Sequence, residues 1–336
     1  MPISGNSRLG VKNQKEIKDK ILNMKVSVCL TVFNEEESIG DLLNSLLKQS
    51  KKPDEIVVID GGSKDKTAQI IRHFQKKDKK IKLLVQKCTR AEGRNLSCEL
   101  AKNEIIAITD ADCTADSKWL RRVTDPFKHK EIDMVAGFYS MLAVTPFEKA
   151  LSYFLAVTPK RFSSDFLPST RSVAFRKSLW ERVGGFPEDS NNSAEDTDFN
   201  YEVVKIGAGI ARTKDAIVFW KIPTDLKLAL NKFYNYAKWD AKKMILWHPT
   251  QKFRSHNIKA LLKFFRYGIF FLTLFYASQN IMFLGIFILE ISLYFYWIYR
   301  KLYYEYENFK TSLWGIPIHI MNDVGVMLGF ISGLIS

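Results

Sequence analysis

The apolar and polar positions between residues 26 and 109 follow two alternating patterns. Residues 26–32 are mostly apolar, which predicts a strand buried on both faces. In residues 36–49 the apolar side chains recur three and four positions apart and share one helical face; they are Ile39, Leu42, Leu43, Leu46 and Leu47. Further strands are predicted at 55–59, 81–85 and 104–109, and helices at 66–76 and 91–102. Apolar strands joined by helices are typical of a mostly parallel sheet covered on both faces, so we expect an α/β fold.

Acidic residues gather in the turns that follow three of these strands, at 33–37, 60–65 and 110–113. Ligands of open α/β sheets bind beyond the carboxyl ends of the strands, so a site is expected there. Asp110 and Asp112 directly follow an apolar strand, and two such carboxylates can converge on Mg²⁺ or Mn²⁺. An Asp-x-Asp sequence can also be a simple capping turn, and its place at this edge favours the metal interpretation.

The turn after the second strand reads Asp60-Gly61-Gly62-Ser63. Its glycines let the backbone approach a ligand, Asp60 can accept hydrogen bonds from a base or ribose, and Ser63 is predicted to cap the next helix. A tight turn with a serine cap is the alternative. The chain has no G-x-G-x-x-G after the first strand and no Walker-type lysine loop, so dinucleotide and P-loop functions lose their main sequence support.

A second acidic group opens a helix predicted over 194–205. With Ser193 as N-cap, Asp196 is the third helical residue, where the helix dipole favours a negative charge. A carboxylate kept ionised there can accept a proton from an incoming hydroxyl. The alternative is that Glu195 and Asp196 serve only as helix-start acids.

A basic segment lies between residues 169 and 186. It carries Arg171, Arg176 and Lys177 and ends in Gly184-Gly185-Phe186. A glycine pair before an aromatic residue suits a turn that a substrate or another backbone approaches closely. Alternatively, these charges form a solvated face.

The pattern changes after residue 225. Residues 226–266 interleave Lys and Arg with Leu and aromatic residues, which predicts either interfacial helices in the headgroup region or a helical pair packed on the preceding domain. Residues 267–299 hold one acid, Glu290, and would form a helix of roughly 50 Å, too long for one straight span. We therefore expect a membrane hairpin that turns at 278–280, with Lys263 and Arg266 snorkelling on the side of Arg300 and Lys301. A third span is predicted at 313–335.

Composition and charge narrow the function classes. Hydrophobic residues make up 46% and charged residues 26%, which excludes disordered, collagenous and low-complexity proteins. The net charge of +14 indicates an anionic partner, which can be nucleic acid, acidic lipid or a phosphorylated ligand. The four cysteines have neither Cys-x-x-Cys nor zinc-site spacing and are expected to be reduced, in a cytosol-facing domain. Residues 1–23 lack the apolar run of a secretory signal and are expected to form a mobile or weakly helical leader.

In this order, the segments resemble the family 2 glycosyltransferases over residues 25–224. These are inverting enzymes with the GT-A fold, a Rossmann-like nucleotide-diphosphosugar-binding domain. The motifs that carry the resemblance are the first turn with Phe33, Asn34 and Glu35, then Asp60, Gly93-Arg94-Asn95, Asp110-Ala111-Asp112, the segment from Arg176 to Phe186, and Glu195-Asp196. Each motif is weak alone, and their combination is specific.

The resemblance implies a role for each matching position. Asp110 and Asp112 would hold Mg²⁺ or Mn²⁺, and Asp196 would be the catalytic base with Glu195 beside it. The residues implied in binding the nucleotide sugar are Phe33, Asn34, Glu35, Asp60, Gly61, Ser63, Arg94, Asp110 and Arg171.

The sequence departs from the family pattern at three places. Gly61 stands where the family usually has a second acid, and Trp220 stands where many relatives place a metal-binding histidine. The signature Q/R-x-x-R-W of some processive relatives has only Ala237-Lys238-Trp239 as its nearest match, so polymer synthesis is not supported.

The resemblance and the C-terminal pattern together predict a membrane-attached glycosyltransferase. Its catalytic domain, residues 24–225, would face the cytosol, followed by interfacial helices at 226–266 and membrane helices at 267–336. It would move a sugar from a nucleotide-diphosphosugar to a lipid-linked saccharide, with membrane lipids and no nucleic acid as partners. The alternatives are a polyprenyl-phosphate sugar synthase and a non-catalytic sugar-nucleotide-binding membrane protein.

Overall fold

The computed structural model describes residues 24–188, 195–223, 225–244, 246, 252 and 255–335. The predicted leader at 1–23 and the predicted cap Ser193 lie outside these residues. The chain divides into two compact units. The first contains residues up to Ser140 together with Phe166–Trp220, and the second contains Met141–Asp165 together with Lys221–Ser336.

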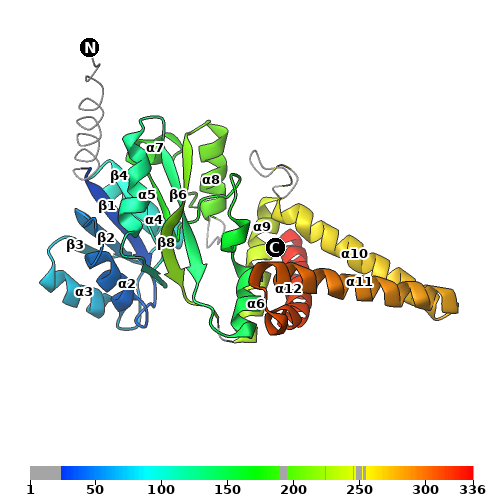
Figure 1. The fold of residues 1–336 in the computed structure, drawn as a ribbon. Helices are drawn as coiled ribbons and strands as arrows, with labels where there is room; N and C mark the ends of the chain where they lie inside the picture. Colours follow the sequence, from blue (N-terminus) through cyan, green and yellow to red (C-terminus); the bar gives the residue numbers. More distant parts are fainter. Residues whose placement is uncertain are drawn as a thin grey trace, which may run out of the picture. The chain divides into compact units, whose positions relative to one another are not determined.

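The first unit is built on an eight-stranded sheet in the order β3-β2-β1-β4-β7-β6-β8-β5 (Figure 1). The strands are β1 (Val26–Val32), β2 (Glu55–Asp60), β3 (Ile81–Val85), β4 (Ile105–Ile108), β5 (Cys113–Ala115), β6 (Met134–Met141), β7 (Val173–Arg176) and β8 (Ile210–Trp220). β1 pairs in parallel with β2 and β4, and β2 with β3, which confirms the parallel half. β7 pairs antiparallel with β4 and β6, and β5 with β8, so the whole sheet is mixed.

The helices of the first unit are α2 (Ile39–Leu47), α3 (Thr67–Lys77), α4 (Arg90–Leu100), α5 (Trp119–Thr124), α7 (Lys177–Arg182) and α8 (Glu195–Lys205). α4 packs against β1 and β2. Its start can approach β1 closely because residue 93 is glycine: a Cβ there would lie 2.5 Å from Cγ2 of Thr31. The next side chain, Arg94, contacts Asp110 at the carboxyl edge of the sheet.

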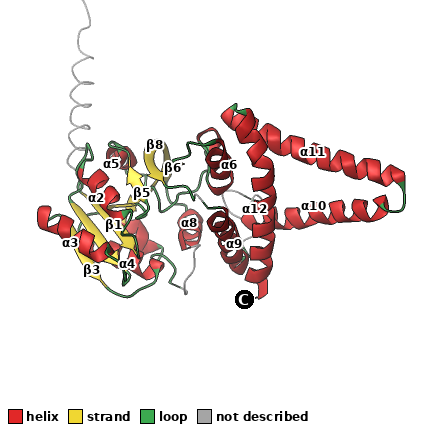
Figure 2. Ribbon diagram, turned by 90° about the horizontal axis from the view of Figure 1, so that it is seen from below, coloured by secondary structure: helices red, strands yellow, loops and turns green. Residues whose placement is uncertain are grey.

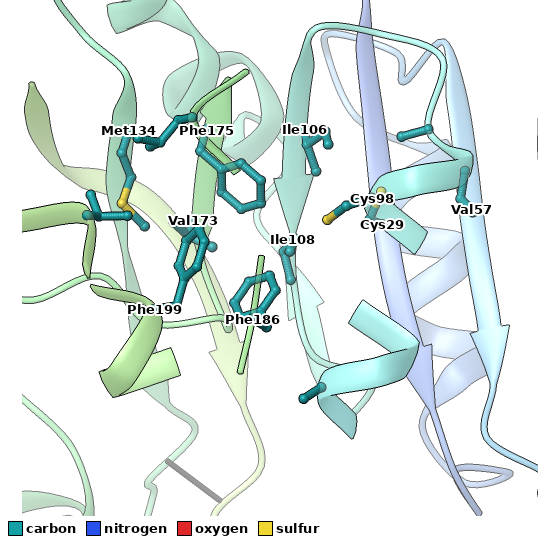
Figure 3. Packing of buried hydrophobic residues seen from close by; sticks show 14 of the residues in the cluster. Cys29, Val57, Cys98, Ile106, Ile108, Met134, Val173, Phe175, Phe186 and Phe199 are labelled. Carbon is teal, nitrogen blue, oxygen red and sulfur yellow. The ribbon is translucent and has the colours of Figure 1, made fainter. Parts of the chain in front are cut away.

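A cluster of aromatic residues packs beside β4 (Figure 3). Phe175 of β7, Phe186 and Phe199 of α8 are all buried, and the rings of Phe186 and Phe199 stack with their centroids 4.3 Å apart. The cluster also includes Ile106 and Ile108 of β4. It therefore holds α8, whose first residues are Glu195 and Asp196, against the sheet.

The second unit contains α6 (Pro146–Leu155), α9 (Leu226–Lys243), α10 (His256–Ala277), α11 (Ile281–Tyr306) and α12 (Phe309–Ile335). α10 and α11 lie side by side and are joined at residues 278–280 (Figure 2). Among the described helices, α11 and α12 are long and apolar enough to cross a membrane, judged by length and composition alone.

α12 packs closely on α9 through small residues four positions apart. Added Cβ atoms at Gly329 and Gly333 would lie 2.1 Å from the carbonyl oxygen of Tyr234 and 2.2 Å from that of Lys238. Small residues at this spacing let two helix backbones approach one another, which is a common device in membrane helix pairs. Substitution by any larger residue would push α9 and α12 apart.

Two features of the second unit differ from the sequence expectations. α10 begins at His256, so the end of the stretch expected to be interfacial and the first half of the expected hairpin form one continuous helix. Lys263 and Arg266, which were expected to snorkel, both contact the buried carboxylate of Asp323. Residues 141–165 belong with the C-terminal helices, since α6 contributes Ala150 and Leu151 to their core, so the first unit is not one continuous segment.

Candidate active site

The turns after β1, β2 and β4 meet at the carboxyl edge of the parallel strands. Backbone N–H of Asn34 donates to Oγ of Ser63 at 2.9 Å, and backbone N–H of Lys64 donates to Oδ1 of Asn34 at 2.9 Å. Asn34 has a φ of 54°, in the left-handed region that asparagine tolerates better than most residues. These bonds join the first two turns into one ledge.

Ser63 does not cap a helix, contrary to the sequence expectation. α3 begins at Thr67, and the hydroxyl of Ser63 instead accepts the N–H of Asn34. Asp60 shapes the same turn, since its Oδ1 accepts the N–H groups of Gly62 and Ser63 at 3.1 and 2.8 Å. Its other oxygen, Oδ2, is buried and has no hydrogen-bond partner among the described residues.

Close contacts favour glycine at position 61, where the resemblance leads us to expect a second acid. A Cβ at this position would lie 3.2 Å from the carbonyl oxygen of Cys88 and 3.7 Å from the ring of Phe33. A side chain here would press on backbone, so the local packing favours glycine. Phe33 itself is exposed beside this turn.

Asp110 and Asp112 follow β4 at the same edge. Asp112 is positioned by Trp220, whose Nε1–H donates to its Oδ2 at 2.7 Å. This contact arises because β5 pairs with β8 in a register that places Cys113 opposite Trp220. Trp220, at the position where the resemblance leads us to expect a histidine, is therefore a hydrogen-bond donor to the second aspartate.

Arg94 joins the two acidic motifs. Its side chain is 5% exposed, and its guanidinium contacts Oε1 of Glu195 and lies 3.0 Å from Oδ1 of Asp110. It also donates to Oγ1 of Thr170 at 3.0 Å. Because these bonds go to protein atoms, Arg94 orients Asp110 and Glu195; its predicted contact with a nucleotide stays a prediction. Thr170 had no sequence signal that distinguished it.

Arg171 adds a second cation at this edge. Its guanidinium lies over the ring of Trp220, 3.7 Å from the centroid, and 5.4 Å from the centroid of Tyr139. Stacking on two aromatic faces holds the planar group in one orientation. The arrangement places a positive charge next to the tryptophan that contacts Asp112.

The charges around Asp110 decide its protonation. Burial raises the pKa of this carboxyl, but Arg94, Arg171 and Arg90 outweigh burial and hold the pKa below its usual value. Burial raises the pKa of Glu35, helped by the nearby charges of Asp112 and Asp110 and opposed by its hydrogen bond with Ser38. Glu35 therefore lies within electrostatic reach of both aspartates.

Asp196 is the second residue of α8, because the helix begins at Glu195. The helix start was expected to keep this carboxyl ionised, but burial and a neighbouring carboxylate oppose its ionisation. Burial and the adjacent Glu195 raise the pKa of Asp196 to about 6, although Arg94 and Arg171 lower it. A carboxyl with this pKa is mostly ionised at pH 7 and takes up a proton more readily than an ordinary aspartate.

The donors at this edge suit a hard divalent cation with few protein ligands. Within the part of the chain that the structure describes, no group of three or more His, Cys, Asp or Glu side chains is arranged to hold a metal. Asp110 and Asp112 each have an oxygen bonded to an N–H group, and a carboxylate has further lone pairs to offer. Such a pair fits Mg²⁺ or Mn²⁺ that completes its shell with phosphate and water.

Replacing Arg94 tests its role as the buried link. Arg94→Met is expected to lower the free energy of unfolding by about 3–5 kcal/mol, because the buried carboxylate of Glu195 loses its cation. Arg90→Met is the matched control: Arg90 is exposed and its Nη1 lies 3.9 Å from the same Glu195 oxygen, so about 1 kcal/mol or less is expected. Chemical denaturation of the full chain in detergent measures both. Equal losses would contradict the assignment.

Part of the chain is similar in sequence to known glycosyltransferases. The family model described as glycosyl transferase family 2 matches residues 27–179. Glycosyltransferase AglE of Haloferax volcanii is 29% identical over 169 residues, which are 48% of this chain and 56% of that protein. Cholesterol galactosyltransferase of Borreliella burgdorferi is 27% identical over 168 residues, 49% of this chain and 44% of that protein. The matched regions span about half the length of these curated relatives.

A solved structure shares the fold over nearly the whole chain. It is the mannosyltransferase PcManGT from Pyrobaculum calidifontis in complex with GDP-Man and Mn²⁺. The two chains are 18% identical, with a TM-score of 0.60, and the similarity covers 93% of this chain and 94% of that one. At this identity the similarity shows the fold, including helices that follow the sheet domain.

Proposed function

We propose that this chain, whose residues 27–179 match the family model of glycosyl transferase family 2, transfers a sugar from a nucleotide-diphosphosugar to a hydroxyl of a lipid-linked saccharide. The observation that carries the proposal is the link through Arg94 between Asp110 and Glu195, which brings the donor-side acids and Asp196 to one edge of the sheet. GDP-Man in the complex of the structural neighbour makes this donor the first to test.

Each group at the edge has a chemical task in the proposed reaction. Asp196 accepts the proton of the acceptor hydroxyl while the hydroxyl oxygen attacks the anomeric carbon, and the nucleoside diphosphate departs from the opposite face. A single displacement of this kind inverts the configuration. A divalent cation held by Asp110 and Asp112 would supply positive charge to the departing diphosphate. Arg171 contributes a fixed cation at the same edge.

The nucleotide would lie on the ledge formed by the first two turns. The buried Oδ2 of Asp60 has no hydrogen-bond donor among the described residues, and an N–H group of the base would satisfy it. The exposed ring of Phe33 next to Gly61 offers an aromatic surface for stacking. These features support a role for the Asp60 turn in binding the base.

The protonation of Asp196 favours a hydroxyl acceptor over a phosphate acceptor. A phosphate is already ionised near neutral pH and needs no base, whereas a sugar hydroxyl does. A carboxyl with a pKa of about 6 suits a base that works near pH 7. This supports a saccharide acceptor rather than the polyprenyl-phosphate alternative.

The test is turnover of sugar nucleotides by the full chain in detergent. GDP-mannose and other nucleotide sugars are incubated with a membrane lipid extract, with Mn²⁺ or with EDTA, and release of nucleoside diphosphate is measured. Release that requires both the extract and Mn²⁺ is the expected result. Donor binding without any release would support the non-catalytic alternative.

We also propose that the second unit anchors the protein in the membrane, with the first unit on the cytosolic side. The apolar helices α11 and α12 support the anchor, and the cations at 263, 266, 300 and 301 support the orientation. The lipid substrate in the name of the Borreliella relative is consistent with an acceptor at a membrane.

Alkaline carbonate washing of membranes tests the anchor. The full chain is expected to stay in the pellet, because helices that cross the bilayer are not removed by charge or pH. A peripheral protein bound to the same membranes is the control and should appear in the wash. Recovery of the full chain in the wash would leave only an interfacial attachment.

A further inference from the structure

A buried carboxylate in the second unit gathers cations from a neighbouring helix. Asp323 of α12 is fully buried, and its two oxygens contact Nζ of Lys263 and the guanidinium of Arg266, both from α10. Hydroxyls of Tyr267 and Tyr294 donate to Oδ2 at 3.2 and 2.7 Å. We call these five residues the Asp323 cluster.

The Asp323 cluster has more positive than negative charge. Lys263 and Arg266 share the carboxylate of Asp323. Lys301 of α11 lies close enough for both cations to repel it electrostatically and for Asp323 to attract it. Arg161 also repels Lys301. Lys263, Arg266 and Lys301 together carry three positive charges against the single negative charge of Asp323, so two positive charges remain. An additional anion would neutralise this excess positive charge.

A groove of about 490 Å³ between α10 and α11 is lined by one of these cations, Arg266. Ile269, Phe270 and Leu293 form its apolar walls, and Arg266, Tyr294 and Trp297 line it as well. Nε of Arg266 is buried and has no hydrogen-bond partner among the described residues. The ammonium of Lys301 lies 3.4 Å from the ring centroid of Trp297, at the same end.

Glu290, the acid that lines the groove, lies away from its cationic end. Glu290 is seven residues before Trp297, about 10 Å along α11, and it accepts a hydrogen bond from Thr273 at 2.8 Å. The groove is thus cationic and aromatic at one end and mostly apolar along its walls. An amphiphile with an anionic head matches both parts.

We propose that this groove binds one anionic phospholipid of the bilayer, with its phosphate on Arg266 and Lys301 and an acyl chain along Ile269 and Leu293. A guanidinium pairs with phosphate oxygens through two N–H donors, which the orphaned Nε can join. Basic pockets between membrane helices and interfacial tryptophan are typical of such lipid sites. The inference rests on the membrane anchor proposed above and does not depend on the transfer reaction.

Lipid binding is measured with the full chain in a nonionic detergent. Phosphatidylglycerol and phosphatidylcholine with identical acyl chains are added in turn, and native mass spectrometry counts the lipids retained while thermal unfolding gives Tm. One retained phosphatidylglycerol with a raised Tm is expected, and phosphatidylcholine should be retained less. Equal retention of both lipids, or the same Tm rise with inorganic phosphate alone, would overturn the proposal.

Three variants locate the site. Arg266→Gln should weaken phosphatidylglycerol binding about tenfold or more through the loss of charge-assisted hydrogen bonds. Arg300→Gln is the matched control, because Arg300 is exposed and does not line the groove, and it should change binding little. Leu293→Trp fills the groove without altering charge, and since Leu293 is exposed it does not depend on the Asp323 cluster for folding. It too should lose the bound lipid.

Several results would refute the site. Equal losses in the Arg266 and Arg300 variants would reduce the effect to surface charge, and unchanged binding in Leu293→Trp would place the lipid elsewhere. Displacement of phosphatidylglycerol by a lower concentration of a polyprenyl phosphate would assign the groove to an acceptor lipid instead. The carbonate wash and donor turnover are separate readouts, so failure of the anchor or of the proposed reaction is recognised independently.

Discussion

Asp196→Asn is expected to lower kcat for sugar transfer by on the order of 10²–10⁴ while leaving the affinity for the nucleotide sugar almost unchanged. The amide keeps the shape of the side chain, but it cannot accept the proton of the acceptor hydroxyl. Transfer rate and donor Kd, measured on the same preparation, separate the two effects. Glu202→Gln, an exposed acid-to-amide change on the same helix, is the control and should have little effect.

The pH dependence of the transfer rate is a second test of the role of Asp196. Burial and Glu195 raise the pKa of Asp196 to about 6, so the base is protonated and inactive below this pH and ionised above it. The wild-type rate should therefore rise with pH, with a midpoint near 6, and this limb should vanish in the asparagine variant. Turnover of the variant at the wild-type rate would make Asp196 a helix-start acid and favour a phosphate acceptor.

Asp112→Ala is expected to lower kcat by on the order of 10²–10³, the scale for losing one preorganised electrostatic stabiliser at a developing charge. Its carboxylate is held by Trp220 at the edge where the diphosphate is proposed to leave. The Mn²⁺ concentration for half-maximal rate should also rise, which a general loss of folding would not produce.

Asp116→Ala is the matched control for this prediction. Asp116 lies four residues further on and bonds to Lys118 and Arg122. Its loss should leave the Mn²⁺ dependence unchanged. Full wild-type activity in EDTA would contradict metal participation altogether.

Much of the first unit could be predicted from local pattern. The alternation of apolar strands with one-sided helices predicts the parallel half because burial on both faces requires apolar side chains at successive positions. Asp110 and Asp112 follow β4 directly, so their place at the sheet edge is a local property of the chain. The turn at 278–280 is also local, because a polar triplet interrupts a long apolar stretch.

Features that depend on distant segments could not be predicted in the same way. The direction of β7, β6 and β8 in the sheet depends on long connections that carry no periodicity of their own. α6 packs with the C-terminal helices, although its sequence neighbours belong to the sheet unit. A truncation after residue 224, near the end of the catalytic domain predicted from sequence, would expose the face of α6 that Ile298 and Leu302 cover.

The sequence by itself therefore determined which acids stand at the ends of strands, because that follows from residues adjacent in the chain. Only the tertiary structure decided what these acids contact. Arg94 reaches Asp110 across 16 positions and Glu195 across 101, and Trp220 reaches Asp112 across 108. The pKa of Asp196 likewise depends on burial and on charges brought together by folding, since solvent exposure and through-space distance are not properties of any local pattern.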